Sequence, residues 1–198
     1  MYRKQMALQK ALCILAVSAS ALVFIYALGY MTDIYDMIYM LRESYKTEGI
    51  VQFLTDMDLF NRVLVRAGIG LILVSLTLLL TNTHIRRKYY VGNYVAVGLN
   101  VCADAAAAAW AHTQIAAFKA QYLAEGFIDF ETVKSWADRN ARNGGISVYT
   151  ESTFWFDVHY FVFGILLLAA VLLILNTIWK ISLMKRERNA LAAGKAAA

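Results

Sequence analysis

Residues 154–183 read FWFDVHYFVFGILLLAAVLLILNTIWKISL, and this stretch decides the fold class. Its formal charges are Asp157 near the start and Lys180 near the end. A helix of this length, rising about 1.5 Å per residue, is long enough to cross the ~30 Å hydrocarbon core of a bilayer. The stretch therefore predicts a membrane-spanning helix.

Three further apolar stretches precede it, and they are Ala11–Met31, Val63–Thr81 and Val91–Phe118. Each approaches or exceeds the ~20 residues that a membrane-spanning helix needs. The first resembles a signal peptide in its basic start, but its apolar run continues through Leu28, beyond the ~7–15 apolar residues of such a peptide. We therefore expect four transmembrane helices in one domain that covers residues 1–198.

The charges between these stretches are sorted by side. Eleven Lys and Arg residues, against one acid, Glu187, lie before the first stretch, between the second and third, and at the end of the fourth. The other two intervals contain twelve of the fourteen carboxylates, counting Asp157. Because Lys and Arg of short loops stay on the cytoplasmic side, this pattern predicts cytoplasmic N- and C-termini. The same rule explains the net charge of +5, so nucleic-acid binding is not expected.

The two cysteines, Cys13 and Cys102, fall inside apolar stretches. The outer intervals contain no cysteine, and the chain contains no Asn-x-Ser/Thr sequon. These absences argue against a disulfide scaffold and favour a bacterial plasma membrane, that is, the inner membrane.

The outer intervals, residues 32–62 and 119–153, are predicted to be structured. Residues 34–45 and 50–60 each place apolar side chains at helical spacing, which predicts two short amphipathic helices on the outer membrane surface. Asp129 is a candidate N-cap for a further helix. The expected fold is an all-α integral membrane protein, a four-transmembrane-helix bundle with a small, mostly helical extracytoplasmic cap.

The predicted cap is rich in aromatic residues. Five of them are candidates for docking a partner protein: Tyr35, Tyr39, Phe60, Trp136 and Trp155. Exposed apolar patches of this kind mark interaction surfaces. The alternative is an interfacial aromatic belt together with packing inside the cap, because Trp and Tyr are enriched where a membrane meets water.

One carboxylate, Asp104, lies at the middle of the third stretch. A charge there costs a few kcal/mol, so the side chain must face the interior, be protonated or be paired. Asn100 and Asn93 share its helix face, and His112 continues that face toward the outer side. Together with a cation of the second stretch they form a candidate buried polar track: Asn93, Asn100, Asp104, His112 and Arg66.

Two interpretations of this track compete. In the functional one, Asp104, His112 and Arg66 bind ions or relay protons. In the structural one, Asp104 is satisfied by Asn100, by Arg66 or by a serine of the first stretch such as Ser20, and it fixes helix register. Arg66 could instead extend to the membrane interface.

The motifs HExxH, CxxC, GxSxG and the P-loop are absent, so we expect neither catalysis nor a bound metal or cofactor. The leading expectation is a non-enzymatic multi-pass membrane subunit that acts through protein–protein contacts. Its partners are the lipid bilayer and either a second copy or another membrane protein, in an accessory, scaffold or homo-oligomeric role. The expected contact role rests on two features, a large aromatic cap and an interior that we expect to contain few polar groups. The alternative is an oligomeric channel, or an ion- or proton-coupled transporter, with Asp104 in its lining.

Overall fold

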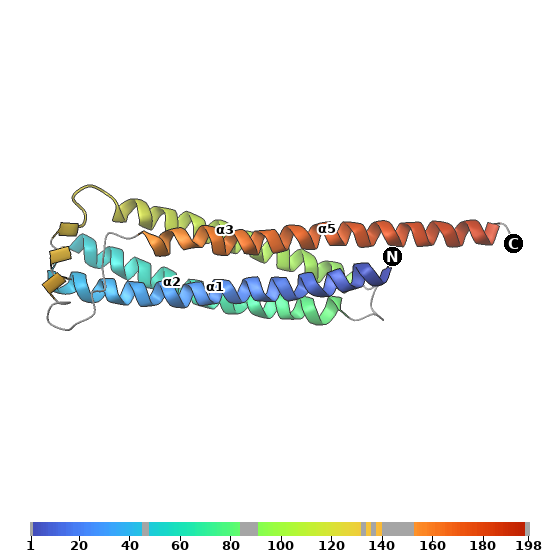
Figure 1. The fold of residues 1–198 in the computed structure, drawn as a ribbon, viewed down its shortest axis with the longest axis horizontal. Helices are drawn as coiled ribbons and strands as arrows, with labels where there is room; N and C mark the ends of the chain where they lie inside the picture. The colour runs from blue at the N-terminus through green and yellow to red at the C-terminus, as the bar shows by residue number, and fades with distance from the viewer. Residues whose placement is uncertain are drawn as a thin grey trace. The chain divides into compact units, whose positions relative to one another are not determined.

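The computed structural model describes residues 2–44, 48–83, 91–131, 134–135, 138–139 and 153–196. Every regular element in these ranges is helical, and Figure 1 labels the four long helices. They are α1 (Tyr2–Ser44), α2 (Glu48–Asn82), α3 (Val91–Tyr122) and α5 (Phe154–Ala196).

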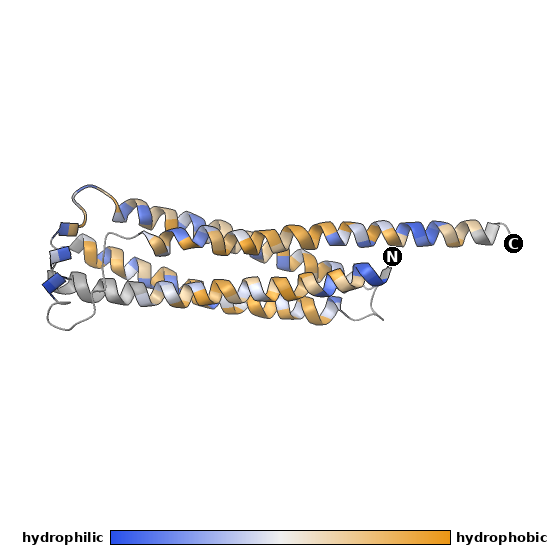
Figure 2. Cartoon of the chain, in the orientation of Figure 1, coloured by the Kyte–Doolittle hydropathy of each residue, from blue (hydrophilic) through white to orange (hydrophobic). Residues whose placement is uncertain are grey.

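Each long helix contains a segment long and apolar enough to cross a membrane. These segments are Arg3–Thr32, Gly49–Asn82, Gly92–Tyr122 and Phe154–Ala193. Figure 2 shows that apolar residues fill most of α5 up to a hydrophilic segment near its C-terminal end. The four predicted spans are thus confirmed in length and composition.

The two short amphipathic helices expected in residues 34–45 and 50–60 are not separate elements, and this expectation was wrong. Helix α1 runs without a break to Ser44, and α2 already begins at Glu48. The reason is that neither stretch contains glycine or proline. Polar and charged side chains alone do not end a helix, so each long helix continues through them.

Three residues with turn-forming or helix-capping chemistry lie near the helix boundaries. Gly126, which follows the end of α3, has φ 74°, a left-handed conformation that glycine adopts without strain. Oδ1 of Asp129 accepts a hydrogen bond from the backbone N–H of Glu131 at 3.1 Å, which confirms Asp129 as an N-cap. Thr153 directly precedes α5, and its carbonyl oxygen accepts from the N–H of Asp157 at 3.0 Å.

The chain forms two compact units, and each contains a segment of all four long helices. Unit 1 comprises Met1–Ala21, Ile69–Ala107 and Ile165–Ala198. Its apolar core consists of small and branched side chains from the four helices, namely Leu12, Cys13, Ala16, Leu78, Val97 and Leu173.

Unit 2 comprises Leu22–Gly68 and Ala108–Gly164, and its core is aromatic. The buried rings are Tyr26, Tyr30, Phe53, Phe60, Phe118, Tyr122, Phe156 and Phe163. Neighbouring rings often meet edge to face, as Tyr30 does with Phe60 at 6.2 Å between centroids. Such pairs stabilise a core by about 0.5–1.5 kcal/mol beyond the apolar area that they bury.

Candidate functional site

The interior of unit 1 contains more polar side chains than the sequence led us to expect, and the expectation of few polar groups was wrong. The buried ones are Gln5, Gln9, Ser20, Ser75, Asn82, Asn93, Asn100, Asp104, Asn176 and Lys180. Each helix contributes only a few of these side chains, so none of the apolar stretches looks polar by itself. The polar side chains form a polar interior because the packing of the helices brings them together.

Four of these side chains form a hydrogen-bonded chain that joins three helices. Ser20 on α1 and Ser75 on α2 have their Oγ atoms 2.9 Å apart. Oγ of Ser75 is also 2.9 Å from Oδ1 of Asn100 on α3, and Nδ2 of Asn100 is 2.6 Å from Oδ2 of Asp104. All four side chains are at most 1% exposed. Asn100 is one of the partners that the structural interpretation offered to Asp104, whereas Ser20 of the first span bonds to Ser75 and does not contact Asp104 directly.

A second cluster in unit 1 joins α1 to α5 and was missed in the sequence. Nε2 of Gln5 donates to Oδ1 of Asn176 at 3.4 Å, and Nδ2 of Asn176 donates to Oε1 of Gln9. Nε2 of Gln9 in turn donates to Sγ of Cys13 at 3.7 Å. Gln5, Gln9 and Cys13 repeat every four residues, so they share one helix face, and that spacing was the available signal.

Lys180 is 2% exposed, and its Nζ lies 5.4 Å from the centroid of the Tyr94 ring. The hydroxyl of Tyr94 donates to Sδ of Met184 at 3.3 Å, so these contacts join α3 to α5. A cation over an aromatic face keeps favourable electrostatics when it loses water.

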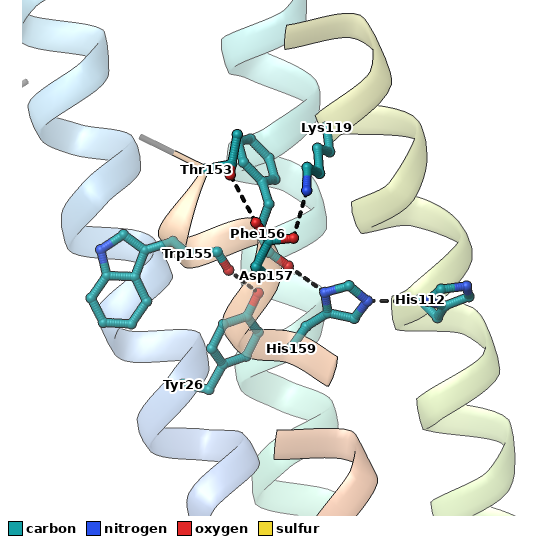
Figure 3. A network of polar contacts seen from close by, with 8 residues as sticks. All are labelled: Tyr26, His112, Lys119, Thr153, Trp155, Phe156, Asp157 and His159. Carbon is teal, nitrogen blue, oxygen red and sulfur yellow. Dashed lines mark hydrogen bonds and ion pairs between the residues drawn. The ribbon is translucent and has the colours of Figure 1, made fainter. Parts of the chain in front are cut away.

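Unit 2 contains a polar network on α3 and α5, drawn in Figure 3. Nδ1 of His159 bonds to the carbonyl oxygen of Phe156, and Nε2 of His159 lies 3.1 Å from Nδ1 of His112. A carbonyl oxygen only accepts, so Nδ1 of His159 is the donor in that bond. In the neutral pair, Nε2 of His159 then accepts from Nδ1–H of His112.

The same network contains an ion pair next to the histidines. Nζ of Lys119 donates to Oδ1 of Asp157 at 2.5 Å, and Oγ1 of Thr153 donates to Oδ2 at 2.7 Å (Figure 3). On the other side of α5, the hydroxyl of Tyr26 donates to the carbonyl oxygen of Trp155 at 2.8 Å. These bonds attach the start of α5 to α3 and α1.

The residues of the predicted polar track are thus distributed between the two units. Asn100 and Asp104 meet in unit 1, and Asn93 is buried in the same unit, where its backbone oxygen accepts from Nδ2 of Asn82 at 3.2 Å. His112 is in unit 2 and bonds to His159. Arg66 is also in unit 2, and its side chain is exposed.

Two of the five docking candidates have described side chains. Phe60 is 5% exposed and packs against Trp110 at 5.0 Å between ring centroids. This contact agrees with packing inside the cap, the alternative to docking. Trp155 is half-buried, and its ring lies against Gly29. Tyr35, Tyr39 and Trp136 lie outside the described side chains, and docking through them stays a prediction.

These features define a class: a protein that is helical throughout its described part, with four helices long and apolar enough to cross a membrane. Its four helices indicate a membrane location. Among the described residues, no three His, Cys, Asp or Glu side chains are grouped so that they could hold a metal ion. The chain matches no protein-family model, no curated protein and no solved structure.

Proposed function

We propose that the chain is a four-pass integral membrane protein of a bacterial plasma membrane, with both termini in the cytoplasm and a helical cap outside. The distribution of polarity carries this proposal. On α2, Leu80 is 73% exposed while Ser75 is fully buried, and on α3, Leu99 is 62% exposed while Asn100 is fully buried. Water favours the opposite arrangement, whereas hydrocarbon favours apolar surfaces and polar groups bonded inside.

Thiol labelling tests the topology. In a variant with Cys13 and Cys102 replaced by alanine, a cysteine at the exposed positions Asp56 or Glu125 reacts with an impermeant reagent on intact cells. A cysteine at the exposed Lys185 reacts only after the membrane is disrupted. If only the cysteine at position 185 were labelled in intact cells, the chain would have the opposite orientation to the proposed one.

Within this membrane setting, the proposed role is that of a non-enzymatic subunit that acts through contacts with another membrane protein or a second copy. The closed polar interior supports it. Asp104 and Asn100 are at most 1% exposed and bond to each other, so a substrate or ion has no access to them in this state. The bonds from Ser75 to Ser20 and to Asn100 join α1, α2 and α3, and in hydrocarbon each bond between helices stabilises by about 0.6 kcal/mol on average and up to about 1.7 kcal/mol.

A second candidate function, a channel or a proton-coupled transporter, is favoured by one observation. The chain from Asp104 to Ser20 is an unbroken series of groups with exchangeable protons. Against this candidate, Ser20 bonds on its other side to the carbonyl oxygen of Ala16, which carries no proton to pass on.

Reconstitution separates the two functions. The purified chain in liposomes is tested for proton and cation flux, and its mass in mild detergent is measured by light scattering. The subunit proposal expects no flux above that of empty liposomes, and a particle that contains a second copy or a stoichiometric partner. Flux that Asp104→Asn abolishes would establish the conduit instead. A monomer with no partner would refute the contact role.

A further inference from the structure

The hydrogen-bonded chain of unit 1 has too few protons if Asp104 is ionised. The hydroxyls of Ser20 and Ser75 have one proton each. Three contacts require them: Ser20 with the carbonyl oxygen of Ala16 at 2.9 Å, Ser20 with Ser75 at 2.9 Å, and Ser75 with Oδ1 of Asn100 at 2.9 Å. Two protons cannot serve three contacts between oxygen atoms. One pair of buried oxygens would face each other without a proton.

Turning the Asn100 amide does not help an ionised Asp104. It would place Oδ1 of Asn100 against a carboxylate oxygen at 2.6 Å, with no proton between two oxygens of like charge. An ionised Asp104 therefore leaves the chain one proton short in either orientation of the amide.

A proton on Asp104 satisfies every contact. An amide can turn so that its N and O exchange places without a change of shape. Oδ2–H of Asp104 then donates to Oδ1 of Asn100, and Nδ2 of Asn100 donates to Oγ of Ser75. The hydroxyl of Ser75 donates to Ser20, and the hydroxyl of Ser20 donates to the carbonyl oxygen of Ala16. Each contact has one proton, and each serine hydroxyl donates once and accepts once.

The distance between Asn100 and Asp104 is compatible with this arrangement. At 2.6 Å it lies within the ~2.5–3.0 Å of O–H···O bonds. The other carboxyl oxygen of Asp104, Oδ1, is buried and has no hydrogen-bond partner among the residues that the structure describes. An unpartnered oxygen costs far less in a neutral acid than in a carboxylate.

The surroundings of Asp104 offer no charge that would hold it ionised. In unit 1, α1 contains no titratable side chain between Cys13 and Ala21, α2 contains none from Ile69 to Asn82, and α5 contains none from Ile165 to Thr177. On α3 itself, the segment of unit 1 adds only Tyr94 and Cys102. Among the described residues, the hydrogen-bond partner of Asp104 is Asn100, and no cation pairs with it.

We propose that Asp104 is a buried proton-binding site, which holds one proton in the native protein at neutral pH and starts a one-way hydrogen-bonded chain from α3 through α2 to α1. The site goes beyond the proposed contact function and does not depend on it. Loss of the proton breaks one of the four bonds, so proton binding and the packing of these three helices are linked.

Infrared spectroscopy of the purified protein tests the site. The wild type is expected to show the carbonyl band of a protonated carboxylic acid at neutral pH, and Asp104→Asn is expected to lack it. Asp157→Asn is the matched control, since Asp157 is partly exposed and bonded to Lys119, and the band should remain. The absence of the band in the wild type, or its persistence in Asp104→Asn, would overturn the proposal. If Asp104→Asn does not fold, Asp104→Ser, which keeps a hydroxyl donor, takes its place.

Proton release on unfolding is a second readout. An Asp in water ionises near pH about 3.9, so the unfolded chain cannot keep this proton at neutral pH. The wild type should release about one proton more than Asp104→Asn on denaturation. For each increase of one pH unit, the folding equilibrium constant of the wild type should then fall about tenfold more than that of Asp104→Asn, because the native wild type binds the extra proton. Equal proton release by the two proteins would refute the site.

Discussion

Gly68→Ala is expected to destabilise the packing of α2 against α1, while Gly70→Ala is not. A Cβ atom added at Gly68 would lie 3.0 Å from Cα of Phe24 and 3.2 Å from its backbone nitrogen. These neighbours belong to the backbone of α1, which cannot turn aside as a side chain can. A Cβ at Gly70, on the same helix, would meet nothing within 4 Å.

The size of the effect follows from two opposing terms. Replacing glycine by alanine inside a helix stabilises by about 0.5–1 kcal/mol, and this gain is common to both variants. Overpacking a close contact costs about 1–3 kcal/mol, and this cost applies to Gly68 alone. The difference between the two variants removes the common term and should be about 1–3 kcal/mol.

Unfolding in detergent, followed by circular dichroism at increasing denaturant concentration, measures this difference. The order of stability should be Gly70→Ala, then wild type, then Gly68→Ala if the overpacking cost exceeds the helix gain. Gly68→Ala with a stability equal to or above that of Gly70→Ala would show that α1 and α2 do not approach closely at Phe24.

Two further substitutions test polar contacts by the same unfolding assay. Ser75→Ala removes the central link of the chain in unit 1 and should cost about 1–2 kcal/mol, because two buried partners lose a hydrogen bond. Thr77→Ala is its control on α2, since the exposed Thr77 hydroxyl bonds only within its own helix, and it should change stability by less than about 0.5 kcal/mol. Asp157→Asn should cost less than about 1 kcal/mol, because the pair with Lys119 is partly exposed, and a double-mutant cycle with Lys119→Met measures the coupling. A cost of several kcal/mol would mean that this pair is shielded from solvent.

The spans could be predicted from the sequence because their signals are local. Hydropathy places the start of α3 at Val91 and the start of α5 at Phe154, and both positions agree with the structure. Asp129 carries backbone chemistry of its own, so the start of the next helix could also be predicted. The pairing of Asn100 with Asp104 was predictable for the same reason, since residues four apart share a helix face.

Contacts between helices could not be predicted in this way. His112 and His159 are 47 residues apart, and nothing in either neighbourhood indicates the other. Arg66 was a candidate partner for Asp104 because it is a cation at a suitable depth, but depth does not say which way a side chain points. The serines were considered singly, and their chain arises only from the packing of α1, α2 and α3.

The exposed end of α5 makes the protein convenient for imaging. Lys185 to Ala193 are helical, and every one of these side chains is exposed, so a fused domain could continue the helix without disturbing the interior. Each residue added at the junction would advance the fused domain by about 1.5 Å and turn it by about 100°. A small series of junction lengths would therefore give a rigid marker at chosen angles, which is what particle alignment of a chain of this size requires.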